Sequence, residues 1–313
     1  MLIAAVPLRT KMTTLYSHSR LSSYENCKKK FHFRYVLELP AESEGVEAFV
    51  GKRVHEVLER LYLFVEREQL PSLERVIERY YALFDEHYDP ERIRIVKAGL
   101  DRAHYRELGA DCLARFYRRH YPFDADQTLG LEQRVVFPLD PEERYGIQGI
   151  IDRVVRARDG AIEVHDYKTG AYVPSQKALD ADRQLALYQI GIERGLDEPA
   201  PIRLVWHYLA KGQIRTSTRT PAQLEALRRE TLERIEQIEA ETDWSATKNK
   251  LCNWCEYREA CPAWGASQAL PTGAARPAPA SERAAPGQPA ERPPAKKPAP
   301  NLRQTPDGQI ELL

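Results

Sequence analysis

The stretch from Asp152 to Lys168 constrains the fold of this chain more than any other. It lies within IDRVVRARDGAIEVHDYKT, which begins at position 151. Two runs rich in Ile, Val and Tyr, 145–155 and 161–169, flank the dipeptide Asp159-Gly160. Because Asp-Gly between such runs is a strong signal for a tight turn, we expect a β-hairpin here.

The register of this hairpin decides which side chains meet. Alternate residues of a strand point to the same face, so Asp166 and Lys168 share one face and Tyr167 points to the other. A loop of odd length, or a bulge, places Asp152 opposite Asp166, whereas a strict two-residue loop places it opposite Tyr167. A site that uses both carboxylates therefore requires the odd register.

Two carboxylates and one ammonium group on a strand face are costly unless something relieves their repulsion. Like charges raise each other's pKa, and a bound divalent cation is the usual relief. Oxygen ligands suit Mg²⁺ or Mn²⁺, and a lysine beside such an ion can orient water and stabilise charge on a phosphodiester. The alternative interpretation is a surface hairpin with an ordinary ion pair.

Composition divides the 313 residues into a folded region and a tail. From Ala266 the chain is dominated by Ala, Pro and Gly, which predicts a disordered segment at 266–313, after a folded region at 15–265 and an extension at 1–14. The formal net charge is zero, so a nucleic-acid surface must be a local patch. Without a membrane-spanning run or a convincing signal peptide, we expect a cytoplasmic protein that starts at Met1 or Met12.

Hydrophobic periodicity predicts helices on both sides of the hairpin. A short helix begins near Ser19, and 47–69, 73–87 and 93–121 form a helical insertion before the sheet. Further segments are a first strand at 131–139, a helix at 182–193, strands at 202–210 and 214–218 joined at Gly212, and a helix from Thr220-Pro221 to about Glu241. The fold class is therefore α/β.

Several single residues have ordinary explanations when they are taken alone. His55, beside the apolar stripe of its helix, is more often a boundary residue than a ligand. Glu132 could face the site or simply pair with an arginine such as Arg134 or Arg153. Tyr24, Phe31 and Tyr35 lie among basic residues, where they could stack on unpaired bases or belong to the core.

The cysteines indicate a metal site. Cys252, Cys255 and Cys261 have the spacing C-x2-C-x5-C, and Cys27 is the best fourth ligand because Cys112 fits a buried helical position. In a cytosolic protein this spacing favours a metal over disulfides. Spacing alone allows either Zn²⁺ or a [4Fe–4S] cluster.

Six segments in the same order resemble a known family. They are SRLSSYENC, GKRVHEVLE, GIIDRVV, VHDYKTG, RQLALYQ and CNWCEYREAC. Together they resemble the PD-(D/E)xK nuclease superfamily, and within it the RecB-type exonuclease domains with an iron–sulfur staple, which include nucleases of CRISPR adaptation. The first carboxylate motif reads I-D-R rather than P-D, a common variation that keeps the ligand.

The resemblance implies a fold and a set of roles. It implies a restriction-endonuclease-like mixed central sheet flanked by helices, with a helical insertion and an Fe–S staple. His55, Asp152, Asp166 and the backbone carbonyl of Tyr167 would bind Mg²⁺ or Mn²⁺, and Lys168 would be the catalytic lysine. Gln184 and Tyr188 would line the site and position DNA, and Cys27, Cys252, Cys255 and Cys261 would hold the cluster.

The expected function is a metal-dependent DNA exonuclease acting on single strands or ends, in recombination, repair or CRISPR adaptation. The alternative is a non-catalytic DNA-binding or scaffold subunit with a structural metal cluster. No Walker A pattern is present, so any unwinding must come from a partner such as a helicase. The final residues Gln309 to Leu313 resemble a peptide that docks on the sliding clamp, although Leu313 stands where phenylalanine is usual.

Overall fold

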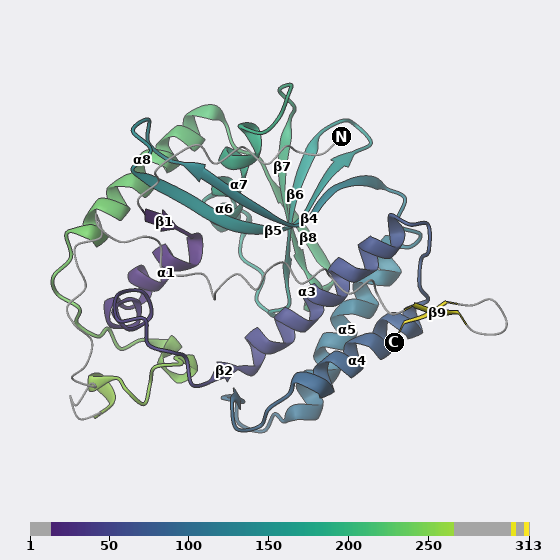
Figure 1. Cartoon of the computed structure of the whole chain (residues 1–313), viewed down its shortest axis with the longest axis horizontal. Helices are drawn as coiled ribbons and strands as arrows, with labels where there is room; N and C mark the ends of the chain where they lie inside the picture. The colour runs from purple at the N-terminus through teal and green to yellow at the C-terminus, as the bar shows by residue number, and fades with distance from the viewer. Residues whose placement is uncertain (1–13, 266–301, 305–309, 313) are drawn as a thin grey trace. The chain divides into compact units, whose positions relative to one another are not determined.

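A mixed six-stranded sheet carries the hairpin, as the computed structural model shows for residues 14–265, 302–304 and 310–312 (Figure 1). Its strand order is β1-β5-β6-β7-β8, and β4 pairs with β5. The bounds of these strands are β1 Thr14–Tyr16, β4 Asp126–Pro138, β5 Tyr145–Ala157, β6 Ile162–Lys168, β7 Ile202–Tyr208 and β8 Gln213–Ser217. The expected α/β fold with a mixed central sheet flanked by helices is confirmed.

Strand β5 changes partner along one of its edges. β4 pairs antiparallel with residues 146–157 of β5 and so occupies one edge of that strand. On the other edge, β1 pairs in parallel with residues 145–147 and β6 pairs antiparallel with residues 153–156. Residues 148–152 therefore lie in a gap between two partner strands, where side chains can replace the missing ladder hydrogen bonds.

The hairpin between β5 and β6 has the odd loop that the sequence required. Arg153 pairs with His165, so the same register places Asp152 opposite Asp166. The loop is the three residues 158–160, closed by the hydrogen bond from Ala157 N to Ala161 O at 2.9 Å. Gly160 has φ +85°, the left-handed conformation that glycine adopts without steric cost.

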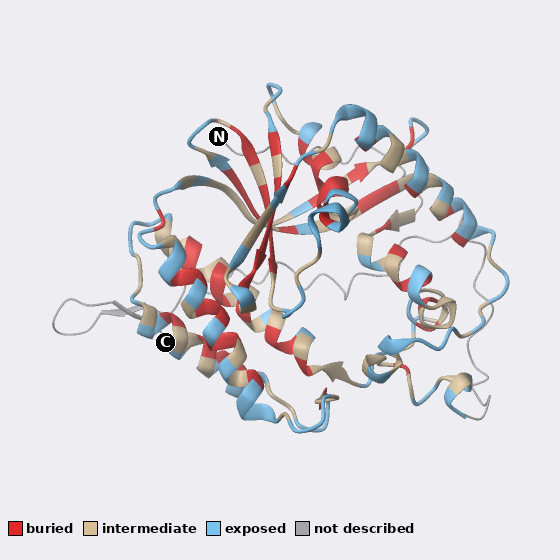
Figure 2. Ribbon diagram, turned by 180° about the vertical axis from the view of Figure 1, so that it is seen from behind, coloured by how far each residue is buried: buried red, intermediate tan, exposed pale blue. Residues whose placement is uncertain are grey.

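Helices cover the sheet, with the helical insertion as a separate group (Figure 1). The insertion consists of α3 (Val46–Val65), α4 (Leu73–His87) and α5 (Arg102–His120), and its core includes Tyr167 of β6. A second core joins β5, β6 and β7 to α7 (Gln184–Glu193), and Figure 2 shows both as buried interiors. The two faces of β6 thus contact different helical groups.

The remaining elements complete the domain. The N-terminal segment contains α1 (His18–Asn26), α2 (Lys28–Phe31) and a π-helix, η1 (His32–Val36). The others are β2 (Glu44–Gly45), β3 (Ile93–Arg94), α6 (Gln176–Asp180), η2 (Leu209–Lys211), α8 (Pro221–Glu239), η3 (Lys250–Trp254) and η4 (Pro262–Trp264). No helix in the described residues is long and apolar enough to cross a membrane.

Several predicted boundaries were wrong. The first helix is capped by Ser17, whose hydroxyl accepts from Arg20 N at 3.1 Å, and not by Ser19. The helix predicted at 93–121 begins only at Arg102, because Asp101 caps it and Gly99 (φ +76°) turns the chain before it. The sheet begins with β1, not with 131–139, since a three-residue strand has too little pattern to detect.

The tail was predicted to be disordered, and most of it lies outside the described residues. Within it the structure describes two short antiparallel strands, β9 (Leu302–Gln304) and β10 (Ile310–Leu312), in a second unit spanning Ala278–Leu313. The predicted clamp-docking peptide at Gln309–Leu313 lies only partly within the described residues and stays a prediction.

Candidate active site

Asp152 occupies the gap beside β5. Its Oδ2 accepts a hydrogen bond from Tyr167 N at 2.6 Å, so the carboxylate takes a backbone donor that a continuous ladder would have paired. The N–H of Tyr167 points to Asp152, and its carbonyl oxygen points to His55. The break in the ladder therefore holds the Asp152 carboxylate close to the Tyr167 carbonyl.

His55 of α3, in the helical insertion, contacts both the Tyr167 carbonyl and the Asp152 carboxylate. Its Nε2 lies 2.8 Å from Tyr167 O, and its Nδ1 lies 3.3 Å from Asp152 Oδ1. Burial alone would lower the pKa of His55, but the hydrogen bond and charge of Asp152 raise it to about 9. A Cβ on Gly51, one turn earlier, would lie 3.4 Å from Thr169 Oγ1, so α3 passes within van der Waals distance of the residue that follows β6.

Asp166 and Lys168 form the second half of the site. Lys168 Nζ lies 2.8 Å from Asp166 Oδ2 and donates to Gln184 Oε1 at 3.0 Å, and Gln184 Nε2 donates to Asp166 Oδ1 at 3.2 Å. Burial raises the pKa of Asp166, the charge of Lys168 opposes this, and Asp152 adds to the rise. Burial lowers the pKa of Lys168, but Asp166 reverses the effect, so the net pKa is raised and the ammonium stays charged at neutral pH.

Glu132 of β4 is a further carboxylate at the site. Of the two alternatives that the sequence left open, facing the site and pairing with an arginine, the structure has the first. Leu131 pairs with Arg153 and Gln133 with Ile151, so Glu132 lies opposite Asp152. Ligand atoms of His55, Glu132 and Asp152 all lie within 4.8 Å of one another. Burial and the neighbouring Asp152 raise the pKa of Glu132 to about 7.

The backbone of Glu132 has an unusual conformation. Its φ is +43°, in the left-handed region that non-glycine residues seldom adopt, and such conformations often occur at functional sites. Arg153, one of the alternative partners, instead bonds Asp126 and Thr128. The sequence signal that could have found Glu132 is its register opposite Asp152, which requires knowing how β4 pairs.

These donors fit a divalent cation. Imidazole nitrogen, carboxylate oxygens and a backbone carbonyl converge from four elements, α3, β4, β5 and β6, and clustered carboxylates are costly without a cation. Carboxylate and carbonyl oxygens suit Mg²⁺ and Mn²⁺, whereas imidazole favours transition metals, so the mixed set favours Mn²⁺ of the two.

A comparison with protein families matches most of the chain to one family. The family model described as the PD-(D/E)XK nuclease superfamily matches residues 15–262. The chain belongs to this superfamily. A search of curated proteins gave no match.

Two solved structures are similar to this nuclease at low identity. One is a protein from Eubacterium rectale named as a candidate exonuclease, with 12% identity, a TM-score of 0.45, and coverage of 78% of this chain and 88% of that chain. The other is SSO0001, with 16% identity, a TM-score of 0.30, and coverage of 78% and 95%.

The Gln-Tyr pair on α7 lies beside the Asp166–Lys168 half of the candidate site. Gln184 contacts both Asp166 and Lys168, whereas Tyr188 is buried and hydrogen-bonds Gln184. A Cβ on Gly149 would lie only 2.2 Å from Tyr188 Cε1, so the tyrosine ring packs directly on β5 at a glycine.

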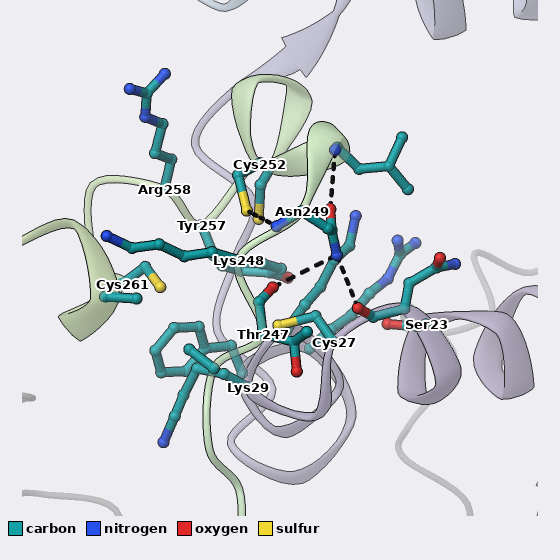
Figure 3. A pocket seen from close by; sticks show the side chains of 18 of the residues that line it. Ser23, Cys27, Lys29, Thr247, Lys248, Asn249, Cys252, Tyr257, Arg258 and Cys261 are labelled. Carbon is teal, nitrogen blue, oxygen red and sulfur yellow. Dashed lines mark hydrogen bonds between the residues drawn. The ribbon is translucent and has the colours of Figure 1, made fainter.

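The four predicted cluster cysteines line one cavity, of about 370 Å³. Figure 3 shows the sulfur atoms of Cys27, Cys252 and Cys261 directed toward its middle. Asn249 N donates to Cys252 Sγ at 3.3 Å, which would stabilise a thiolate. The fifth cysteine, Cys112, is fully buried in the helical insertion, as predicted.

The aromatic residues near Cys27 belong to the core. Tyr24 and Phe31 are buried together, and Tyr35 packs against them. Neighbouring Lys30 and Arg34 pair with Glu256, at 2.7 and 3.4 Å. The suggestion that these rings stack on unpaired bases is therefore not supported.

Proposed function

We propose that this nuclease is a metal-dependent DNA exonuclease acting on single strands or ends. The observation that carries the proposal is the convergence of His55, Asp152 and the Tyr167 carbonyl beside the Asp166–Lys168 pair. Hydrolysis of a phosphodiester needs stabilisation of developing negative charge and a positioned water, and this arrangement supplies the groups for both.

In this proposal His55, Asp152, Asp166 and the Tyr167 carbonyl hold Mg²⁺ or Mn²⁺, with Glu132 as an additional carboxylate. The bound cation would supply Lewis acidity and an activated water. Asp166 also holds the Lys168 ammonium, which is fixed by two contacts and carries its charge at neutral pH. Lys168 would therefore stabilise charge on the phosphate while Gln184 and, through it, Tyr188 keep the ammonium in place.

We propose further that the cysteine cavity holds a [4Fe–4S] cluster, with structural Zn²⁺ as the alternative. The four thiols line one cavity together. Four thiolates are the ligand set of a [4Fe–4S] cluster and of a tetrahedral Zn²⁺ site alike. The cluster would make the protein a RecB-type nuclease and staple Cys27 to the C-terminal end of the domain.

We propose the pathway and partners from the absence of a helicase motif in the sequence. Without a Walker A motif, the nuclease would act on DNA already single-stranded or unwound by a helicase or recombination partner. Recombination, repair and CRISPR adaptation all supply such strands. Gln309–Leu313 could add docking to the sliding clamp, and a cytoplasmic location agrees with these roles.

Digestion of labelled DNA tests the proposed activity. Anaerobically purified protein should shorten linear single-stranded DNA with Mn²⁺ or Mg²⁺ and leave circular single strands intact. Lys168→Ala and Asp166→Asn should abolish cleavage while leaving the fold intact, whereas Lys177→Ala, on exposed α6, should cut normally. Full activity in Lys168→Ala would refute the assignment, and DNA binding without cleavage would favour a scaffold role.

The cluster has its own test. Anaerobic protein should absorb visible light and contain four iron atoms per chain if the cluster is [4Fe–4S]. Cys255→Ser should lose both signals, while Cys112→Ser should keep them because Cys112 lies in another core. A colourless protein with stoichiometric zinc would establish the alternative.

A further inference from the structure

One face of the β4–β5 pair is open to solvent beside the candidate active site. Arg134 of β4 lies directly opposite Ile150 of β5, so the two side chains share a face of the sheet. Arg134 is exposed, and the side chain of Ile150 is 54% exposed. The two strands therefore present a cation and an apolar side chain to solvent next to each other.

This face also carries a carboxylate of the candidate active site. Ile151 belongs to the core with α7, so Ile150 points to the opposite side of the sheet. Asp152 points to that side as well, because its carboxylate contacts His55 of α3, which packs on the face away from α7. Ile150 is therefore two residues, or about 6.6 Å of strand, from Asp152 along one surface.

The same surface continues away from the site. Val136 and Gln148 are the next pair along the two strands and lie directly opposite each other. Val136 and Ile150 belong to none of the hydrophobic cores that the described residues form, whereas the alternate positions Val135, Phe137 and Ile147 are buried in cores. Arg134, Val136, Gln148 and Ile150 together form an open strand surface that begins at the metal-ligand groups.

Arg134 gives the open strand surface a positive charge. Its guanidinium donates to Gln148 Oε1 at 3.5 Å, and in the described part of the chain no carboxylate pairs with it. A neutral amide is a weaker acceptor for a guanidinium than a phosphate, which forms charge-assisted hydrogen bonds with it. The open strand surface therefore favours an anion two residues away from the position of the scissile phosphate.

We propose that the substrate strand runs along the open strand surface, with Arg134 on the phosphate next to the scissile one and Ile150 against the nucleotide between them. The inference rests on the proposed nuclease function and names how that nuclease holds its substrate. Phosphate contacts carry no sequence information, and every nucleotide offers an apolar face, so the surface is indifferent to base identity. A base can lie against Ile150 only when it is unpaired, which agrees with a preference for single strands or ends.

Binding measurements test the contact of Arg134. Lys168→Ala protein, which by the proposed function binds DNA without cutting it, is titrated with a labelled single strand at several salt concentrations in Mn²⁺. Adding Arg134→Gln should lower the slope of log affinity against log salt by about 0.7, so the affinity lost is about fivefold greater at 0.1 M than at 1 M salt. Arg156→Gln, at an exposed position at the other end of β5, is the matched control and should keep both the affinity and the slope.

The contact of Ile150 has a different signature. Ile150→Ser should weaken binding without changing the salt slope, because an apolar contact releases no counterions. Ile150→Val keeps most of the apolar surface and should restore the affinity. Since both side chains are exposed, these variants should keep the melting temperature of the parent protein.

Modified oligonucleotides locate each contact. A neutral methylphosphonate at the phosphate next to the scissile one should weaken binding by the parent protein but not by its Arg134→Gln variant. An abasic residue at the nucleotide between the two phosphates should weaken binding by the parent but not by its Ile150→Ser variant. Each variant should stay sensitive to the other modification, because each removes one contact only.

The results separate the two proposals. If the wild type cuts DNA but Arg134→Gln keeps the parent's affinity and salt slope, or Arg156→Gln loses as much, the open strand surface does not hold the substrate and the nuclease assignment stands. Variants that keep the parent's sensitivity to both modifications would overturn the inference in the same way. If the Lys168→Ala protein binds no DNA and the wild type cuts none, the proposed function itself fails.

Discussion

Gly149→Ala should damage the candidate active site from a position that does not touch it. The new Cβ would lie 2.2 Å from Tyr188 Cε1, while ordinary contacts begin at 3.4 Å, so the ring or the strand must move by about 1.2 Å. Tyr188 is only 6% exposed, so its ring cannot swing into solvent. Because Gln184 contacts Tyr188 as well as Lys168 and Asp166, we expect the displacement of the Tyr188 ring to move both of these side chains.

The expected magnitude follows from this displacement. Overpacking a core costs about 1–3 kcal/mol, and misplacing a catalytic group by about 1 Å costs roughly a hundredfold in rate. Gly149→Ala should therefore lower the melting temperature and reduce kcat about a hundredfold, while DNA affinity changes little. Thermal denaturation, single-turnover cleavage and binding measured separately would distinguish these effects.

Gly170→Ala is the matched control. Gly170 lies two residues after Lys168, and a Cβ there meets no atom within 4 Å, so this variant should keep wild-type stability and rate. In the double variant Gly149→Ala/Tyr188→Leu, the second change should cost less than it does in the wild type, because the clash has gone. Wild-type cleavage by Gly149→Ala would show that Tyr188 does not support Gln184.

Two further predictions concern buried charge. The pKa of Glu132 is raised in the folded protein, so folding favours its protonated form, and the stability of metal-free protein should fall as pH rises from about 4.5 to 7. Glu132→Gln should flatten this decline in urea unfolding, and identical pH profiles for the two proteins would contradict the interpretation. Arg153→Met should cost about 3–5 kcal/mol in unfolding free energy, because Arg153 is 2% exposed and its loss leaves Asp126 without that partner. Arg156→Met, at an exposed position of the same strand, should cost little, and equal losses in both would refute a special role for the Arg153–Asp126 pair.

Local signals predicted those elements that carry their own caps and periodicity. The helix 73–87 was found with both ends correct, since its apolar stripe is regular and Ser72 caps it. Thr220-Pro221 marked the start of α8, where Thr220 and Gln223 form a reciprocal capping box. The odd hairpin loop was required by the chemistry of Asp152 before any geometry was known, and the structure has it.

Features that depend on distant partners could not be predicted. β1 has three residues, and its pairing with Tyr145 to Ile147 crosses more than 100 positions of chain. Glu132 belongs to the site only because β4 pairs with β5 in one register and its backbone adopts a positive φ. No local pattern carries either property, so periodicity placed Glu132 on a strand and left open whether it faced the site.

Contacts between the N-terminal and C-terminal segments of the domain affect the order in which it can fold during synthesis. Asn249 Nδ2 donates to Asn26 O at 2.9 Å and Tyr257 OH to Leu39 O at 3.0 Å, contacts that span 223 and 218 residues. His55, Asp152, Lys168 and Gln184 all leave the ribosome before these C-terminal partners exist. At roughly 5–20 residues per second, the 73 residues from Gln184 to Tyr257 take about 4–15 seconds. A nascent chain therefore holds all four of these proposed site residues for some seconds before its first helices can contact the C-terminal segment.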